Sequence, residues 1–319
     1  MGKGRPPKWS RRQLIDGIRW RLRTGAPRRD APGCYGHRFS VYGLFRRWQR
    51  KGVAPVPLPF VPGIEVSGHI RALGPGVTGL RAGQPVAALT VVDSSGYAEV
   101  VTTSADRIAP LDDLDLGLDV AAAIPSNSTT AFLVLDKVAR IAPRESVLVH
   151  AAAGGVGSQL GQAAKLLGAG RVAGTVGSHA KIETARGFGY QEVVLREEHP
   201  SGFDIVIDMV GGTTRRTGID ALNPMGRLIV MGNASGAEDV GIPANELWFT
   251  DKTVSGFNLA AFSAAFPAEA GRALRRAVAA VAAGDLLLRV EELTLDQAAE
   301  AHRRLESGTT TGKLVLKVS

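Results

Sequence analysis

The sequence predicts an α/β protein, in which a doubly wound parallel sheet is joined to a smaller unit made mostly of β-strands. The 319 residues are 45% hydrophobic and 21% charged, a globular composition that can bury a sizeable core. From residue 146 onward, short apolar runs alternate with helical segments, which is typical of parallel strands joined by helices. Before that point, short apolar runs lie between Gly and Pro turns, which favours antiparallel strands.

The first 53 residues differ from the rest of the chain in charge. They carry 15 Lys or Arg against two acids, whereas residues 54–319 carry 23 Lys or Arg against 28 acids. We therefore expect a fusion boundary near Gly52. Two short helices are expected before it, one capped by Ser10 and one beginning near Ser40. With the Gly/Pro segment between them they fit part of a helix-turn-helix that contacts phosphates, or else a solvated basic arm.

This basic head also resembles the N-terminal segment of insertion-sequence transposases. The resemblance rests on GRP at 4–6, RTGAPRRDAP at 23–32 and VYGLFRRWQRKG at 41–52, and it stops there. In that family the acidic residues that hold metal ions lie downstream, in a domain that this chain lacks. The resemblance therefore implies no strand transfer, and nucleic acid as a partner only through residues 1–52.

The remaining elements follow in order from the pattern of apolar runs. In the small unit, strands are expected in FVPGIEVSGHI (60–70), GQPVAAL (83–89) and GYAEVV (96–101). The parallel sheet begins with VLVH (147–150), and four more of its strands are expected at 171–176, 192–195, 203–210 and 226–232. Helices are expected at 158–170, 180–188, 213–222, 267–283 and 295–305, followed by a last strand at 313–318.

The turn after the first strand of the sheet has the glycine spacing of a dinucleotide site. Ala152, Gly154 and Gly157 occupy the three offsets at which the chain must turn tightly, approach the pyrophosphate and pack its helix closely. The helix that follows turns its free N–H groups toward the anion. A purely structural glycine turn is the alternative, but the strand before and the helix after favour nucleotide binding.

The end of the second strand indicates which nucleotide is bound. An NAD site has an acid about 20 residues after the third glycine to bond the ribose 2′-hydroxyl. Here GTVGSHAK at 174–181 offers no acid, whereas Ser178 can donate to a phosphate and Lys181 supplies a cation, with His179 beside them. NADPH therefore fits better. In the alternative interpretation, Ser178 only caps the next helix and Lys181 is a solvated surface residue.

Several other classes of site are excluded or disfavoured. A single cysteine, Cys34, cannot build a Cys-rich zinc site, and no two histidines have metal-ligand spacing. GTTTGK at 308–313 has three residues between its glycines where a phosphate loop needs four, and a strand follows it. No apolar run is long enough for a membrane helix and no signal is readable, so we expect a cytoplasmic protein.

From residue 54 the sequence resembles the zinc-free medium-chain dehydrogenases/reductases of the quinone oxidoreductase (zeta-crystallin-like) family. The residues around the nucleotide turn that carry the resemblance are Glu145, Leu148, Ala152, Ala153, Gly154, Gly155, Gly157, Gln162 and Lys165. LPFVPGIEVSGHI at 58–70, SGYAEVV at 95–101, MGNASG at 231–236 and TTGKLVL at 310–316 keep the family's order. Zinc-dependent relatives carry a His-Glu pair where this chain has Ile64 and Glu65, and their cysteine ligands are absent, which excludes catalytic zinc.

The resemblance implies a domain plan. It comprises a transposase-like head at 1–52, a partial GroES-like catalytic domain at 53–122 to which 260–319 return, and an NADP-binding Rossmann domain at 123–259. The family's first strands are missing from the small domain, which would leave strand edges and apolar surface exposed. Relatives pair their Rossmann sheets edge to edge, so a homodimer through 253–259 is implied.

The resemblance also implies a set of cofactor residues. Ala153 to Gly157 would hold the pyrophosphate, Ser178 and Lys181 the 2′-phosphate, and Val210 and Gly211 the adenosine ribose side. Thr130 and Asn233 would approach the nicotinamide half, and Lys313 would reach the cofactor from the last strand. The implied set is Thr130, Ala152, Ala153, Gly154, Gly155, Val156, Gly157, Ser178, Lys181, Val210, Gly211, Gly232, Asn233 and Lys313. At Leu195 the chain departs from the family, which often has Tyr or His there.

These expectations lead to an NADPH-dependent oxidoreductase that transfers a hydride to a quinone or an activated alkene, with activity impaired if the truncated small domain is incomplete. No general acid is assigned; Tyr97 qualifies on chemistry alone, and a structural tyrosine is the simpler interpretation. Two alternatives stay open. One is a DNA-binding remnant that carries the reductase part as a passenger, and the other is a rearranged product whose NADPH-binding unit turns nothing over.

Overall fold

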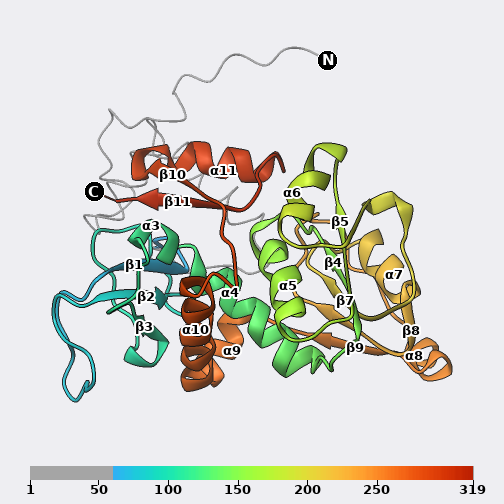
Figure 1. Ribbon diagram of the computed structural model, residues 1–319, viewed down its shortest axis with the longest axis horizontal. Helices are drawn as coiled ribbons and strands as arrows, with labels where there is room; N and C mark the ends of the chain where they lie inside the picture. Colours follow the sequence, from blue (N-terminus) through green and yellow to red (C-terminus); the bar gives the residue numbers. More distant parts are fainter. Residues whose placement is uncertain (1–59, 319) are drawn as a thin grey trace, which may run out of the picture. The chain divides into compact units, whose positions relative to one another are not determined.

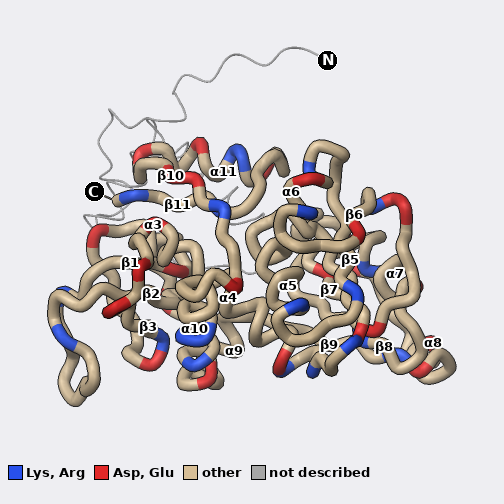
Figure 2. Tube along the Cα trace, in the orientation of Figure 1, with Lys and Arg blue, Asp and Glu red and all other residues tan. Residues whose placement is uncertain are grey.

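The computed structural model describes residues 60–318 and divides the chain into two compact units, Met1–Pro62 and Gly63–Ser319. The helices expected in the basic head lie outside the described residues. The second unit holds all of the elements described below (Figure 1). Along its trace, basic and acidic residues are interspersed rather than gathered in one region (Figure 2).

A six-stranded sheet forms the larger part of this unit, in the order β6-β5-β4-β7-β8-β9. All neighbouring strands run parallel. Its strands are β4 (Ser146–His150), β5 (Arg171–Val176), β6 (Glu192–Leu195), β7 (Phe203–Asp208), β8 (Leu222–Val230) and β9 (Thr253–Gly256). The predicted doubly wound parallel sheet is confirmed. The strand order reverses between β5 and β7, on either side of β4, and such a point opens a crevice at the carboxyl ends of the strands.

Helices cover both faces of the sheet because its strands are apolar on both sides. Val147 and Val149 of β4 pack with α5 (Gly155–Leu166) in the larger core, whereas Leu148 between them packs with α7 (Thr213–Asp220) in a second core. This alternation places α5 and α7 on opposite faces. The remaining helices of this part are α6 (Ile182–Gly187) and α8 (Ala244–Thr250).

The smaller part of the Gly63–Ser319 unit, called the small unit below, contains an antiparallel sheet of β1 (Glu65–His69), β2 (Pro85–Leu89) and β3 (Ile108–Pro110). A separate parallel pair is formed by β10 (Val290–Thr294) and β11 (Lys313–Lys317). The associated helices are α3 (Leu118–Ala121), α9 (Leu259–Ala265), α10 (Pro267–Ala282) and α11 (Ala298–Glu306). Between the small unit and the parallel sheet, Figure 1 shows α4 (Ile124–Leu133), which continues into a π-helical turn, Val134–Ala139.

One expected strand is absent. Residues 97–100 form bends rather than a strand, and no described strand pairs with residues 96–101. Ser94 and Ser95 have positive φ angles of 60° and 80°, so the chain turns immediately before the segment where a strand was predicted. Gly96 instead donates its N–H to the carbonyl of Gly63 at 3.0 Å. The prediction rested on the alternation of apolar residues alone, and it was wrong because this segment has no neighbouring strand to pair with among the described residues.

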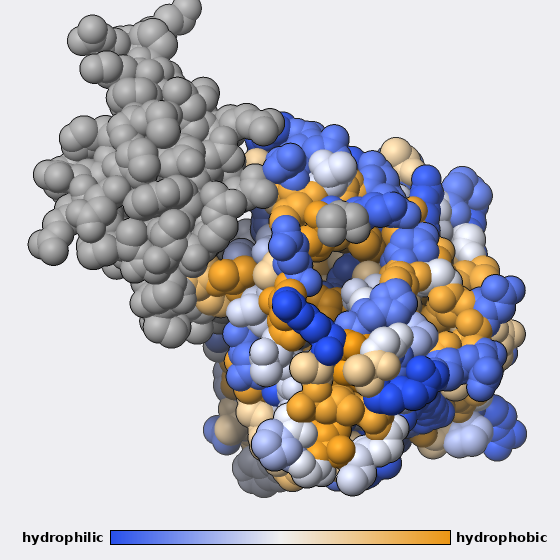
Figure 3. Space-filling view, turned by 90° about the vertical axis from the view of Figure 1, so that its left-hand side faces the viewer, coloured by the Kyte–Doolittle hydropathy of each residue, from blue (hydrophilic) through white to orange (hydrophobic). Residues whose placement is uncertain are grey.

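The small unit exposes several large apolar side chains. Ile64, Leu73, Val92 and Val100 are each more than a third exposed, and Figure 3 shows apolar surface on this side of the unit. Among the described residues, no helix combines the length and the apolar character that crossing a membrane would need.

Candidate functional site

The glycine turn lies at the carboxyl end of β4, where the sheet order reverses. Ala151 has a φ of 56°, and Ala152 donates its N–H to the carbonyl of Thr175 on β5 at 3.0 Å. A Cβ on Gly157 would lie 2.3 Å from the carbonyl oxygen of Ala151, so only glycine lets the helix start so close to the strand. The third glycine of the predicted motif therefore has the close-packing role expected of it.

The start of α5 is open to an anion. Its N-cap, Gly154, contributes no side-chain hydrogen bond, and the first N–H groups of an α-helix have no acceptor within the helix. These donors and the positive end of a helix of 12 residues are suited to a pyrophosphate. Ala152, Ala153, Gly154, Gly155, Val156 and Gly157 are thus brought together as a turn with the shape and polarity of a nucleotide loop.

Tyr190 supports this turn through a buried hydrogen bond, and the sequence alone did not indicate this role. Its side chain is buried, and its hydroxyl donates to the carbonyl of Gly157 at 2.5 Å. A Cβ on Gly161 or on Gly174 would come within 3.0 Å of the tyrosine ring, so both glycines make room for it. Burial raises the pKa of Tyr190, which keeps the phenol protonated as a donor.

The two residues predicted to hold the 2′-phosphate lie at the end of β5. Ser178 begins a short 3₁₀ turn but makes no side-chain capping bond, so the simple capping alternative finds no support. Lys181 donates from Nζ to the carbonyls of Gly308 at 2.6 Å and Thr310 at 2.9 Å. Desolvation, followed by the nearby charge of Arg196, lowers the pKa of Lys181. Lys181 is therefore tied to the C-terminal segment rather than free in solvent.

That C-terminal segment also touches the nucleotide turn. Gly312 donates its N–H to the carbonyl of Ala153 at 3.2 Å. The next residue, Lys313, forms an ion pair with Glu65, whose other carboxylate oxygen accepts the N–H of Ser126 at 2.7 Å. Lys313 thus links β11 to β1 and to the start of α4, and its predicted contact with the cofactor stays a prediction.

All ten residues of α4 are buried, and its first half is unusually polar. Ser128 donates to Oε1 of Gln159 on α5 at 2.9 Å. Among residues 60–318, the side-chain N–H groups of Asn127 and the hydroxyl of Thr129 find no partner. The amide nitrogen of Asn127 lies 2.6 Å from the Cβ position of Gly155, directly over the nucleotide turn. Thr130, a predicted cofactor residue, follows on the same buried helix and is 4% exposed.

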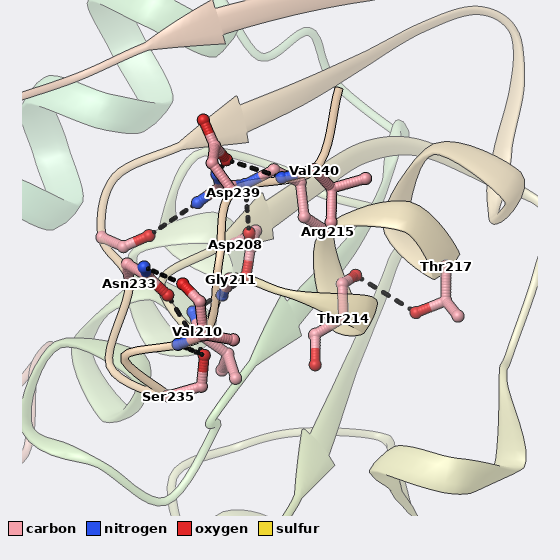
Figure 4. Close-up of polar contacts among 12 residues, drawn as sticks. Asp208, Val210, Gly211, Thr214, Arg215, Thr217, Asn233, Ser235, Asp239 and Val240 are labelled. Atoms are coloured by element: carbon pink, nitrogen blue, oxygen red, sulfur yellow. Dashed lines mark hydrogen bonds and ion pairs between the residues drawn. The ribbon is translucent and has the colours of Figure 1, made fainter. Parts of the chain in front are cut away.

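The loops that follow β7 and β8 are held together by a buried ion pair (Figure 4). Asp208, with no exposed surface, accepts the N–H groups of Val210 at 2.8 Å and Gly211 at 2.9 Å. It also accepts from Nε of Arg215 at 3.1 Å. Arg215 in turn donates to the carbonyl of Gly232 at 2.9 Å. The predicted residues of the two loops are therefore tied to one shared anchor.

Asn233 fills the space beside that anchor. A Cβ on Gly211 would lie 2.2 Å from Oδ1 of Asn233, so glycine is required where the two loops meet. Asn233 donates to the carbonyl of Ala237 at 2.8 Å and accepts from the hydroxyl of Ser235 at 3.1 Å. Asn233 is therefore held in a fixed orientation between the two loops.

Tyr97, the residue weighed as an acid on chemistry alone, faces α11. Its hydroxyl lies 3.3 Å from Nε2 of His302. Burial, and then the charge of Glu65, raises the pKa of Tyr97, and burial lowers the pKa of His302. Both groups are therefore neutral at pH 7. Across residues 60–318 no group of three or more His, Cys, Asp or Glu side chains is arranged to hold a metal ion.

Three protein-family models match different parts of the chain. A model described as zinc-binding dehydrogenase matches residues 189–316, and one described as alcohol dehydrogenase GroES-like domain matches 42–113. Residues 1–55 match a model described as a putative transposase of the IS4/5 family. The resemblance of the head to transposases is thus confirmed.

Curated relatives and solved structures extend the comparison. A quinone oxidoreductase of Pseudomonas aeruginosa is 30% identical over 287 residues, which cover 84% of this chain and 86% of that protein. A 2-haloacrylate reductase of a Burkholderia species is 32% identical over 238 residues, or 68% of this chain and 69% of the relative. The crystal structure of Escherichia coli quinone oxidoreductase complexed with NADPH superposes with a TM-score of 0.76 at 29% identity, covering 86% of this chain and 88% of that one.

Other relatives are longer. The human synaptic vesicle membrane protein VAT-1 homolog-like is 35% identical over 189 residues, which are 57% of this chain and 44% of that protein. The chain thus spans less than half the length of the VAT-1 homolog and homolog-like proteins that it matches at 34–35% identity.

Proposed function

Because the chain belongs to the medium-chain dehydrogenase/reductase family, with the quinone oxidoreductases among its relatives, we propose that it transfers a hydride from NADPH to a quinone or an activated alkene. The observation that carries the proposal is the turn at 151–157, where a required glycine and an uncapped helix start leave backbone donors for a pyrophosphate. A relative in complex with NADPH supports the choice of cofactor. We further propose that residues 123–259 form a Rossmann domain and that residues 53–122 and 260–319 form a partial GroES-like domain. We also propose that the protein is located in the cytoplasm.

The described residues fit the proposed cofactor. The N–H groups at the start of α5 would bind the pyrophosphate, and the loops anchored by Asp208 would lie along the ribose and nicotinamide. The unpartnered amide of Asn127 lies beside Gly155 and would donate to the bound nucleotide. When bound, NADPH supplies the hydride from C4 of its nicotinamide, and the protein supplies orientation and a cleft that excludes water.

We propose that the reaction needs no metal. Ile64 and Glu65 stand where zinc-dependent relatives have a His-Glu pair; Ile64 has no metal-binding atom, and the carboxylate of Glu65 is committed to Lys313 and to the N–H of Ser126. Reduction of a quinone takes one hydride and one proton. We assign no side chain as the proton donor and propose that water supplies the proton. Activity that persists after dialysis against a chelator would support this part of the proposal.

The proposal is tested by NADPH oxidation with a simple 1,4-quinone, followed at the absorbance of the reduced cofactor and compared with NADH. We expect a quinone-dependent rate that is higher with NADPH. No rate above the enzyme-free control, in a sample shown to be folded, would contradict a reductase and leave a nucleotide-binding protein. The same sample should be run with a 2-haloacrylate, since one relative bears that name.

Two further parts of the proposal concern partners. β9 is an edge strand of the parallel sheet, and close to it in sequence α8 exposes Trp248 and Phe249, which stack with their ring centroids 4.7 Å apart. This supports a homodimer through 253–259, which light scattering with a Trp248→Glu variant would test.

The match of residues 1–55 to a transposase model favours, as a second function, DNA binding by the head. Loss of DNA affinity on deleting residues 1–52, and a steep salt dependence before deletion, would support it.

A further inference from the structure

Arg196 is the first residue after β6, at the same edge of the sheet as the predicted 2′-phosphate residues. β5 and β6 are parallel and pair Val176 with Leu195, so the residues that follow each strand lie side by side. A Cβ on Gly177 would lie 3.5 Å from Nη2 of Arg196. The guanidinium therefore lies over the first residue after β5, directly before Ser178.

The guanidinium of Arg196 has no partner in the described part of the chain. Its side chain is half-buried, its Nε is buried without an acceptor, and no carboxylate of residues 60–318 forms an ion pair with it. At the other end of the same strand pair, by contrast, Arg171 is paired with Glu192 at 2.6 Å. The nearby Glu198 instead accepts the N–H of Leu195 at 2.8 Å. A cation that is partly withdrawn from water without a counter-charge costs free energy, so such an arrangement points to an anionic ligand.

A second cation shares the same place. The charge of Arg196 contributes to lowering the pKa of Lys181, so the two groups repel each other across this edge of the sheet. Two of the three N–H donors of Lys181 go to the carbonyls of Gly308 and Thr310. Lys181 thus holds the C-terminal segment in place, and its capacity to bind a further group is small. The N–H donors of Arg196, by contrast, find no acceptor among residues 60–318 and are available to a ligand.

We propose that Arg196 is the residue that selects NADPH over NADH, by binding the 2′-phosphate with its guanidinium while Ser178 donates from its hydroxyl. The inference rests on the proposed function and assigns to Arg196 a role that the sequence had divided between Ser178 and Lys181. A planar guanidinium offers a phosphate two parallel N–H donors, which an ammonium cannot.

The test uses the full chain and two nucleotide fragments, 2′,5′-ADP and 5′-AMP, with binding measured by calorimetry in the absence of any acceptor. Arg196→Met keeps an unbranched stem and removes the guanidinium and its charge. Arg71→Met removes the same charge from an exposed arginine of the small unit and serves as the matched control. We expect Arg196→Met to bind 2′,5′-ADP at least about tenfold more weakly and 5′-AMP within about threefold of the unmodified chain.

The outcomes separate the inference from the proposed function. If the unmodified chain binds 2′,5′-ADP no better than 5′-AMP, the choice of NADPH is overturned and the inference with it. If it prefers 2′,5′-ADP and Arg196→Met keeps that preference, Arg196 is not the selecting residue, whereas the proposed function stands. Thermal melting shows that each variant is folded; without ligand, Arg196→Met should melt no lower than the unmodified chain, because it loses an unpaired charge. Arg196→Lys should recover only part of the preference.

Discussion

Replacing Asp208 by asparagine should destabilise the Gly63–Ser319 unit by about 3 kcal/mol, at the lower end of the range for breaking a buried ion pair. The substitution preserves shape but removes the charge that faces Arg215, whose side chain is 8% exposed while that of Asp208 is fully buried. It also puts an N–H₂ group near the donors of Val210, Gly211 and Arg215, which now converge on Asp208. The loss stays at the lower end because Arg215 keeps its contacts with Gly232 and Asp239.

Urea unfolding without cofactor measures this loss, and a thermal melt should fall by roughly 6–12 °C for a unit of this size. Asp239→Asn is the control: it removes the other ionic partner of Arg215, but its side chain is 80% exposed, so the expected loss is at most about 1 kcal/mol. The reasoning is refuted if the two variants lose the same stability. If Asp208→Asn is folded at assay temperature, its Michaelis constant for NADPH should rise more than its turnover number falls, because we propose that the loops anchored by Asp208 lie along the cofactor.

Three further predictions follow from the same part of the chain. Gly157→Ala should abolish detectable NADPH binding by fluorescence titration, because its Cβ would meet the carbonyl of Ala151 at 2.3 Å; Gly187→Ala, which has open space around it, should bind normally. Tyr190→Phe should lower the unfolding free energy by about 1 kcal/mol in urea and weaken NADPH binding, since it removes the hydrogen bond to Gly157; unchanged values in both assays would contradict a supporting role. Burial lowers the pKa of His150 to about 4, so the unfolded chain takes up a proton there first, and stability should be lost as pH falls from about 6.5 toward 4, by at most about 3 kcal/mol. Urea unfolding at pH 7 and pH 5 checks this, and a His150→Gln variant with the same pH dependence would exclude the histidine as its source.

The features that the sequence predicts well are local along the chain. The turn at 152–157 needs only a strand, three small residues and a helix in succession, and all three are readable within about 20 residues. The alternation of strands and helices likewise predicts the sheet and its direction. The end of the second strand also follows, because it is counted from the glycine turn, whereas binding of a 2′-phosphate by Ser178 and Lys181 stays a prediction.

What could not be predicted depends on which distant residues become neighbours. Arg196 lies over Gly177 because β5 and β6 pair in one register, and the pattern of neither strand contains that register. The ion pair of Lys313 with Glu65 joins residues 248 positions apart. The strand expected at 96–101 failed for a related reason: alternation shows that a segment could be a strand, but only a partner makes it one. The polar residues of α4 gave one signal that could have been used, since five hydroxyl or amide side chains in a row are unusual for a buried helix.

The contact between Gly312 and Ala153 has a consequence for how the protein acquires its site during synthesis. The nucleotide turn and the helix behind it can form as soon as β4, α5 and β5 have left the ribosome, because their contacts are close in sequence. The carbonyls that hold Lys181, and the N–H that meets Ala153, arrive more than 120 residues later. A nascent chain stalled before residue 308 should therefore display a nucleotide turn that lacks its C-terminal contacts, and we expect these contacts to form late in folding.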